Sequence, residues 1–122
     1  MQNEIEFAQW NNFFESINRR NRWRPTRLEV FEQLGTQETE EGLPLVGLRL
    51  DTENEVGPRV YIMLGEHDIS DPRHLTYTIS NATRVLLKQD VDGRDEAVEI
   101  DNAGGQRNLL HFVPSPRVSA IY

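Results

Sequence analysis

The sequence contains no cysteine and a single lysine, Lys88. The lack of cysteine excludes a disulfide framework, a thiolate zinc site and a cysteine nucleophile. The longest apolar run, residues 60–64, is far shorter than the about 20 residues that a membrane-spanning helix requires. The first residues have neither the basic start nor the apolar core of a signal peptide. We therefore expect a cytoplasmic protein that does not bind a membrane.

Motifs of covalent catalysis and of phosphate binding are also missing. No serine lies in a Gly-x-Ser-x-Gly turn, and the pair Gly104-Gly105 precedes a strand pattern, whereas phosphate loops precede a helix. There is no internal repeat and no linker long enough to separate two domains. We therefore predict one domain over residues 1–122, no cofactor and no catalytic residues.

Positive charge is scarce and unevenly distributed. The net charge is −7, which argues against binding to nucleic acid. Five arginines nevertheless fall within residues 19–27, a stretch without any acidic residue. All the acidic residues therefore lie in the rest of the chain, and residues 19–27 form a local basic segment.

The N-terminal segment has the pattern of an amphipathic helix over about residues 4–21. Asn3 and Glu6 fit a capping box, and apolar side chains recur at steps of three and four residues. These apolar residues are Phe7, Trp10, Phe14 and Ile17. Pro25 cannot continue a helix, so we expect the helix to end near Asn21.

After Pro25 the pattern changes to short apolar runs of the β type, separated by glycine, asparagine and aspartate. These runs lie at residues 28–34, 45–50, 60–64, 75–79, 85–87, 98–100 and 109–113. The acidic segment 36–42 is predicted to be a turn, residues 45–47 a bulge, and Asp92-Gly93 a hairpin turn. Residues 60–64 are apolar throughout, which predicts a central strand covered on both faces.

The connections between these runs are short, and short connections favour antiparallel neighbours. The predicted fold class is therefore α+β. An N-terminal amphipathic helix packs on a curved antiparallel meander sheet of about six strands, and rolling into a half-barrel remains an open alternative. The sheet is expected over about residues 26–113, followed by a C-terminal tail over 114–122.

Several short motifs resemble those of a family of small bacterial proteins known only as a domain of unknown function. They are Trp10-x-x-Phe13-Phe14, Leu43-Pro44-Leu45, His74-Leu75-Thr76 and the segment 108–112 (Asn-Leu-Leu-His-Phe). The resemblance runs from about Trp10 to Pro114. It implies a bacterial, cytoplasmic, single-domain protein, and it implies no catalytic residue or ligand.

The basic segment is the main candidate for a binding site, and its candidate residues are Arg20, Arg22, Trp23, Arg24 and Arg27. Arginines around an aromatic ring can bind single-stranded nucleic acid, but such proteins usually carry a basic domain as well. The same arginines could instead cap the helix and pair with acidic residues of the protein itself. Because tryptophan and arginine are favoured anchors of protein interfaces, we prefer a protein partner or a second copy of the chain.

Two acidic segments are weaker candidates for metal binding. Residues 90–96 resemble a calcium loop, but Arg94 and Asp95 occupy positions where that loop needs an oxygen ligand and glycine. A hairpin turn explains the same residues. Residues 66–74 contain two histidines and three acidic residues, which could bind a divalent metal.

These observations lead to three hypotheses of function. The first is a non-catalytic interaction or regulatory module that binds a protein partner or itself. The second is a domain that binds a small hydrophobic ligand, for which the candidate lining residues are Phe7, Trp10, Phe14, Tyr61 and Met63. The third is a metal-dependent enzyme that uses residues 66–74.

Overall fold

The computed structural model describes residues 2–32, 37–53, 55, 57–65 and 74–113. The described elements are β1 (Gln2–Ile5), the 3-10 helix η1 (Phe7–Gln9), α1 (Trp10–Asn21), β2 (Pro25–Phe31), β3 (Gln37–Asp51), β4 (Arg59–Gly65), β5 (His74–Ile79), β6 (Ala82–Gln89), β7 (Asp95–Asn102) and β8 (Arg107–Phe112). The eight strands form one antiparallel sheet in the order β1-β6-β7-β8-β2-β3-β4-β5.

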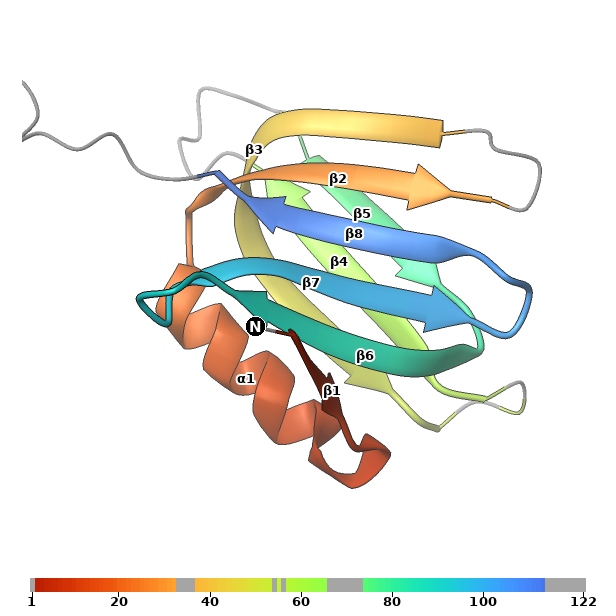
Figure 1. Cartoon of the computed structure of the whole chain (residues 1–122). Helices are drawn as coiled ribbons and strands as arrows, with labels where there is room; N and C mark the ends of the chain where they lie inside the picture. The colour runs from red at the N-terminus through yellow and green to blue at the C-terminus, as the bar shows by residue number, and fades with distance from the viewer. Residues whose placement is uncertain (1, 33–36, 54, 56, 66–73, 114–122) are drawn as a thin grey trace, which may run out of the picture.

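The sheet folds over on itself into two layers (Figure 1). Strands β6, β7, β8 and β2 form the front layer, β4 and β5 lie behind them, and the long strand β3 passes from one layer to the other. The sheet is not closed, since β1 and β5 are its two edges. Helix α1 lies along the open side, next to β1 and β6 and against the second half of β3 (Figure 1). The α+β prediction of one N-terminal helix on a curved antiparallel sheet is therefore confirmed.

The sheet has more strands than the predicted six, and it is not one continuous meander. Strands β2 to β5 form one meander and β6 to β8 form a second. The pairing of β8 with β2 joins them, for example at Leu28↔Leu110. A pairing between strands that are distant in the sequence leaves no local signal, so the hydrophobic pattern could not indicate it.

The predicted start of the helix was wrong. Residues 2–5 form β1, and α1 begins only at Trp10, although it ends at Asn21 as expected. The capping box of Asn3 and Glu6 does not form, because Asn3 pairs with Leu87 of β6 instead. Strand β1 covers the edge of an apolar strand, which would otherwise expose unpaired backbone groups.

Two expectations for β3 and β4 also need correction, and one is confirmed. Residues 37–42, predicted to be a turn, belong to β3 and continue its pairing with β2. Strand β4 was predicted to be central, but it lies next to the edge strand β5, although it is paired on both sides. Tyr61 and Met63 are only half-buried, so β4 is not covered on both faces either. The bulge predicted at residues 45–47 is present, as a register shift between Leu45 and Gly47.

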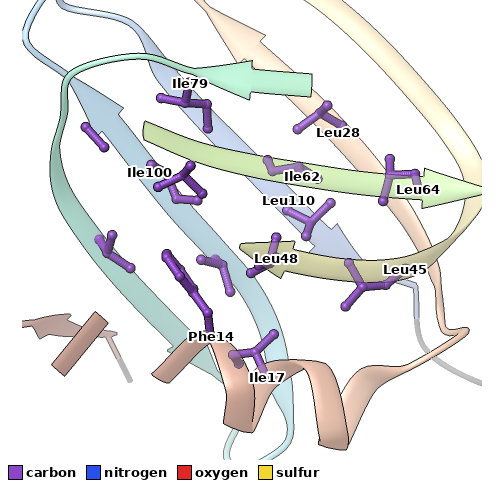
Figure 2. Packing of buried hydrophobic residues seen from close by; sticks show 14 of the residues in the cluster. Phe14, Ile17, Leu28, Leu45, Leu48, Ile62, Leu64, Ile79, Ile100 and Leu110 are labelled. Carbon is purple, nitrogen blue, oxygen red and sulfur yellow. The ribbon is translucent and has the colours of Figure 1, made fainter. Parts of the chain in front are cut away.

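The hydrophobic core lies between the two layers, and α1 closes its open side (Figure 2). Phe14 and Ile17 point from the helix toward Leu48 of β3, and these three residues are at most 3% exposed. The core also contains Leu45, Ile62, Ile79, Ile100 and Leu110. Asn18 fixes the helix on β3, because its side chain accepts a hydrogen bond from the Leu48 amide (2.7 Å) and donates one to the Leu48 carbonyl (3.0 Å).

Candidate functional site

The candidate site is the end of the molecule at which α1 finishes, and we call it the basic end. It comprises residues 19–25, the β6–β7 turn at residues 90–95, and Val113. Figure 1 shows the end of α1 next to the β6–β7 turn. Hydrogen bonds from Arg20 to Asp95 join the two segments, and the Val113 amide donates to the Pro25 carbonyl (2.9 Å). Segments that are far apart in the sequence therefore form one surface.

The backbone at Trp23 adopts an unusual conformation. Its φ is +66°, a left-handed value that costs a non-glycine residue roughly 1–2 kcal/mol. Three hydrogen bonds hold this turn: the Trp23 amide donates to the Leu45 carbonyl (2.8 Å), the Arg24 amide to Asn21 (3.0 Å), and the Leu45 amide to Arg24 (2.9 Å). The turn is thus fixed from both sides, by the end of α1 and by β3.

The buried carboxylate of Asp95 anchors the basic end. It accepts two hydrogen bonds from Arg20 (2.8 and 3.1 Å), one from Asn21 (2.8 Å) and one from Gln89 (3.0 Å). Burial favours the neutral acid, but the hydrogen bonds from Arg20, Asn21 and Gln89 outweigh it and hold the pKa of Asp95 below its ordinary value of 3.8. Arg20 also donates to the hydroxyl of Ser16. Arg20 therefore joins α1 to β7, and most of its donors are used within the fold.

Arg24 has a similar structural role. Its guanidinium donates to Asn21 Oδ1 (2.7 Å), to the Asp95 carbonyl (3.3 Å) and to the Val113 carbonyl (3.4 Å), and it lies 5.2 Å from the centre of the Phe112 ring. Arg24 therefore connects the helix end with the start of β7 and the end of β8.

Arg27 does not belong to this surface. It lies on β2, where it forms an ion pair with Glu29 (3.2 Å) on the outer face of the sheet. Glu29 in turn contacts His111 Nε2 (2.6 Å). The structure thus brings together four of the five candidate residues and separates the fifth.

Arg22 and Trp23 form the exposed part of the basic end. The guanidinium of Arg22 lies 5.5 Å from the centre of the Trp23 ring, and Trp23 is 37% exposed. Val91, at the tip of the β6–β7 turn, is fully exposed, and Val113 is 37% exposed. Three of the four large hydrophobic residues that are exposed in the described part of the chain therefore lie at this end; the fourth is Phe7.

The sequence did not indicate that the β6–β7 turn takes part in this surface. The predicted hairpin at Asp92-Gly93 is present, and Gly93 has a left-handed φ of +81°. Its loop spans residues 90–94, however, and Asp92 lacks the positive φ that a two-residue type I′ turn requires. Asp95, however, is 75 residues from Arg20, and nothing local distinguishes it from an exposed acid. Valine is common in strands, so the sequence did not indicate that Val91 would be exposed at the tip of the turn either.

A second candidate lies on the outer face of the sheet, where β6, β7 and β8 border a hollow of about 290 Å³. Leu86, Ala97 and Leu109 contribute apolar surface to it, and its charged residues are paired. The pairs are Lys88 with Glu96, Arg107 with Glu99, and His111 with Glu29. Ligand pockets bury most of the ligand and present free polar groups, so these paired side chains make the hollow a weaker candidate.

Two neighbouring carboxyl groups lie at or near this hollow. Burial raises the pKa of Asp101 from 3.8 to about 6, and a hydrogen bond with Glu99 and its negative charge act in the same direction. Burial also acts to raise the pKa of Glu99, but hydrogen bonds from Arg107 and Asp101 lower it below its ordinary value. As the pH falls, Asp101 therefore takes up a proton before Glu99 does. Asp101 is not among the residues that line the hollow.

The residues proposed to line a hydrophobic ligand site lie in different parts of the structure. Of the proposed lining residues, Trp10 and Phe14 are buried in the core, Phe7 is 54% exposed, and Tyr61 and Met63 are half-buried on the outer face of β4. These five residues do not line one cavity.

Of the predicted metal-binding segment, only His74 is described, and it is an exposed residue at the start of β5. Residues 66–73 lie outside the described residues. Across the described ranges, no group of three or more histidines, aspartates or glutamates is arranged to hold a metal ion. The helix of the described chain is too short and too polar to cross a membrane.

Comparison of the chain with curated proteins and with solved structures finds no match. One family model matches residues 1–119, and its description is a family of unknown function, DUF5335. This agrees with the resemblance noted from the Trp10, Leu43, His74 and Asn108 motifs. The chain therefore belongs to the family of unknown function DUF5335.

Proposed function

We propose that this protein is a non-catalytic interaction module that binds a protein partner, or a second copy of itself, through the basic end. We also propose that it acts in the bacterial cytoplasm, in agreement with the absence of cysteine and with the resemblance noted from the sequence. The observation that carries the proposal is the exposed Trp23 ring, held in a strained backbone conformation at the same end of the molecule as two exposed valines.

Two physical arguments support this assignment. A strained non-glycine residue persists only where the surrounding structure fixes it, and such residues are concentrated at functional sites. Partly exposed tryptophan and arginine are also the side chains that most often dominate the binding energy of protein interfaces. At the basic end the strain, the aromatic ring and the arginine occur at adjacent positions.

Trp23→Gly is the best variant to test the proposal. It removes the ring, and glycine adopts a φ of +66° without steric cost, which offsets part of the stability lost with the partly buried ring. Urea denaturation of the variant shows whether a loss of binding results from unfolding. Phe7→Ala is the matched control, because Phe7 is also an exposed aromatic residue but lies before α1, at the opposite end of the helix.

The measurement is affinity capture from a lysate of the source organism by the immobilised wild type and both variants, together with sedimentation velocity over a range of concentrations. We expect one protein, or the chain itself, to bind to the wild type and to Phe7→Ala but not to Trp23→Gly. If the wild type and both variants capture the same lysate proteins, and all three remain monomeric, the basic end is not a binding surface.

A further inference from the structure

The arginines of the basic end fall into two groups. Arg20 and Arg24 are hydrogen-bonded inside the fold, as described above. Arg19, Arg22 and Arg94 have no carboxylate partner within ion-pair distance anywhere in the described residues. The basic end therefore presents three guanidinium groups that form no ion pair within the described part of the chain.

Ion pairs are more frequent on the outer face of the sheet. Four of its cations have acidic partners there, in the pairs Arg27–Glu29, Arg84–Glu4, Lys88–Glu96 and Arg107–Glu99. Arg49 instead lies 4.9 Å from the centre of the Tyr61 ring and has no carboxylate within ion-pair distance among the described residues. The chain has an excess of acidic residues, with 20 against 13 basic ones. Unpaired arginines at one end are therefore not explained by a shortage of acids.

The position of Arg22 leaves its hydrogen-bond donors available. The central carbon of its guanidinium lies 5.5 Å from the centre of the Trp23 ring, within the range of cation–π attraction. This attraction uses no N–H donor, so the donors of Arg22 can bind a carboxylate with two parallel hydrogen bonds. Arg22 can therefore bind a carboxylate while it remains in contact with the Trp23 ring.

The charge distribution also limits the kind of polyanion that fits. The basic end contains five arginines and three aspartates, whereas the whole chain has a net charge of −7. A long nucleic acid would extend beyond this small patch and meet the acidic remainder, which repels phosphates. A short segment with a few separate carboxylates would contact the patch alone.

We infer that the partner presents an acidic segment with at least one large apolar side chain to the basic end. Its carboxylates pair with Arg19, Arg22 and Arg94, and its apolar side chain covers Trp23 and Val91. This inference rests on the proposed function and adds the chemistry of the partner to it.

The test is selection of random short peptides, displayed on phage, against the immobilised full-length protein, with soluble Trp23→Gly protein as competitor. The enriched peptides are then synthesised, and their affinity for the wild type, Arg22→Glu and Arg94→Glu is measured by fluorescence anisotropy at low and high salt. Arg84→Glu is the matched control, because Arg84 is a half-exposed arginine on the outer face and the substitution changes the net charge equally.

We expect the enriched peptides to combine aspartate or glutamate with leucine, phenylalanine or tryptophan. Their affinity should fall about tenfold or more in Arg22→Glu and Arg94→Glu, fall at high salt, and change little in Arg84→Glu. In peptides in which acidic residues are replaced by lysine one at a time, one replacement should restore binding to Arg22→Glu and weaken binding to the wild type.

The two proposals fail in different ways. If the enriched peptides are neutral or basic and their binding depends on Trp23, the inference of an acidic partner is wrong. The proposal that the protein is an interaction module would still hold. If no peptide is enriched over the Trp23→Gly competitor, both proposals fail. If a labelled single-stranded oligonucleotide binds in a way that depends on Trp23 and persists at high salt, the inference is wrong and the partner is a nucleic acid.

Discussion

Replacing Asp101 with asparagine is expected to stabilise the protein at neutral pH, although it removes a partly buried polar interaction. Asp101 lies beside Glu99 on β7, and its Oδ1 is buried with no hydrogen-bond partner among the described residues. Burial and the neighbouring Glu99 raise the pKa of Asp101 from 3.8 to about 6. At neutral pH the folded protein therefore carries an ionised group that its surroundings disfavour. Asparagine is neutral at every pH, and its amide can donate to Glu99 as the protonated acid does.

The magnitude follows from the difference between the two pKa values. One pKa unit corresponds to about 1.4 kcal/mol, so the full shift would amount to about 3 kcal/mol. Asp101 is only half-buried, and screening by solvent reduces the expected effect to about 1 kcal/mol. Because the folded-state pKa is raised, this contribution to stability is fully present below pH 3.8 and is lost as the pH rises through about 6. Asparagine cannot ionise, so the stability of Asp101→Asn should not show this loss as the pH rises.

The assay is urea denaturation of the wild type and Asp101→Asn at about pH 5 and about pH 7.5. The variant should be more stable by about 1 kcal/mol at the higher pH, and the gap should narrow at the lower pH. Asp92→Asn is the control, because it removes the same charge from an exposed turn residue. A variant that is less stable than the wild type at the higher pH, or a gap that does not depend on pH, would refute the assignment of the proton to Asp101.

Three further predictions concern the parts that hold α1 in place, and each is measured by urea denaturation. Asp95→Ala should lower the free energy of unfolding by about 3 kcal/mol near neutral pH, because buried donors lose their acceptor. Since the pKa of Asp95 is lowered, its contribution to stability is present above pH 3.8. The difference in stability between the variant and the wild type should therefore shrink as the pH falls below that value. Phe14→Ala should cost about 3–5 kcal/mol, whereas Glu15→Ala, on the exposed side of α1, should change stability by less than about 0.5 kcal/mol. Asn18→Ala should cost about 2 kcal/mol, because two hydrogen bonds to Leu48 are lost together, and a neutral effect would mean that they do not hold the helix.

The fold was predictable where the sequence pattern has a local cause. Alternating apolar residues indicated the strands from 75–79 onward, and the Asp92-Gly93 pair indicated the β6–β7 hairpin, because side-chain period and turn chemistry act over a few residues. The end of α1 was also predictable, since Pro25 excludes a helix and favours extended geometry before it.

The errors occurred where pairing with a distant strand decided the conformation. Asn3 and Glu6 fit a capping box, yet the pairing of residues 2–5 with β6 makes this segment a strand. The acidic residues 37–42 look like a loop, yet pairing with β2 extends β3 through them. In both cases tertiary contacts outweighed local propensity, which amounts to only tenths of a kcal/mol per residue.

The candidate site was predictable in the type of its residues but not in the role of each. The arginines and Trp23 stood out because they are clustered, and the cluster alone could not distinguish a structural arginine from an exposed one. That distinction depends on Asp95, which approaches from the β6–β7 turn and occupies Arg20 but not Arg22. A single sequence contains no signal for this contact.

The division of the arginines also explains how the strained turn at Trp23 persists. The left-handed backbone costs roughly 1–2 kcal/mol, and the hydrogen bonds between Trp23, Arg24 and Leu45, each contributing about 1 kcal/mol, offset it. Arg20 and Arg24 fix the surrounding segments through Asp95. The network therefore fixes the backbone that carries the Trp23 ring, and the ring is 37% exposed. The turn depends on backbone hydrogen bonds and on two arginines whose side chains lie within the fold, so the stability of Trp23→Gly has to be measured together with its binding.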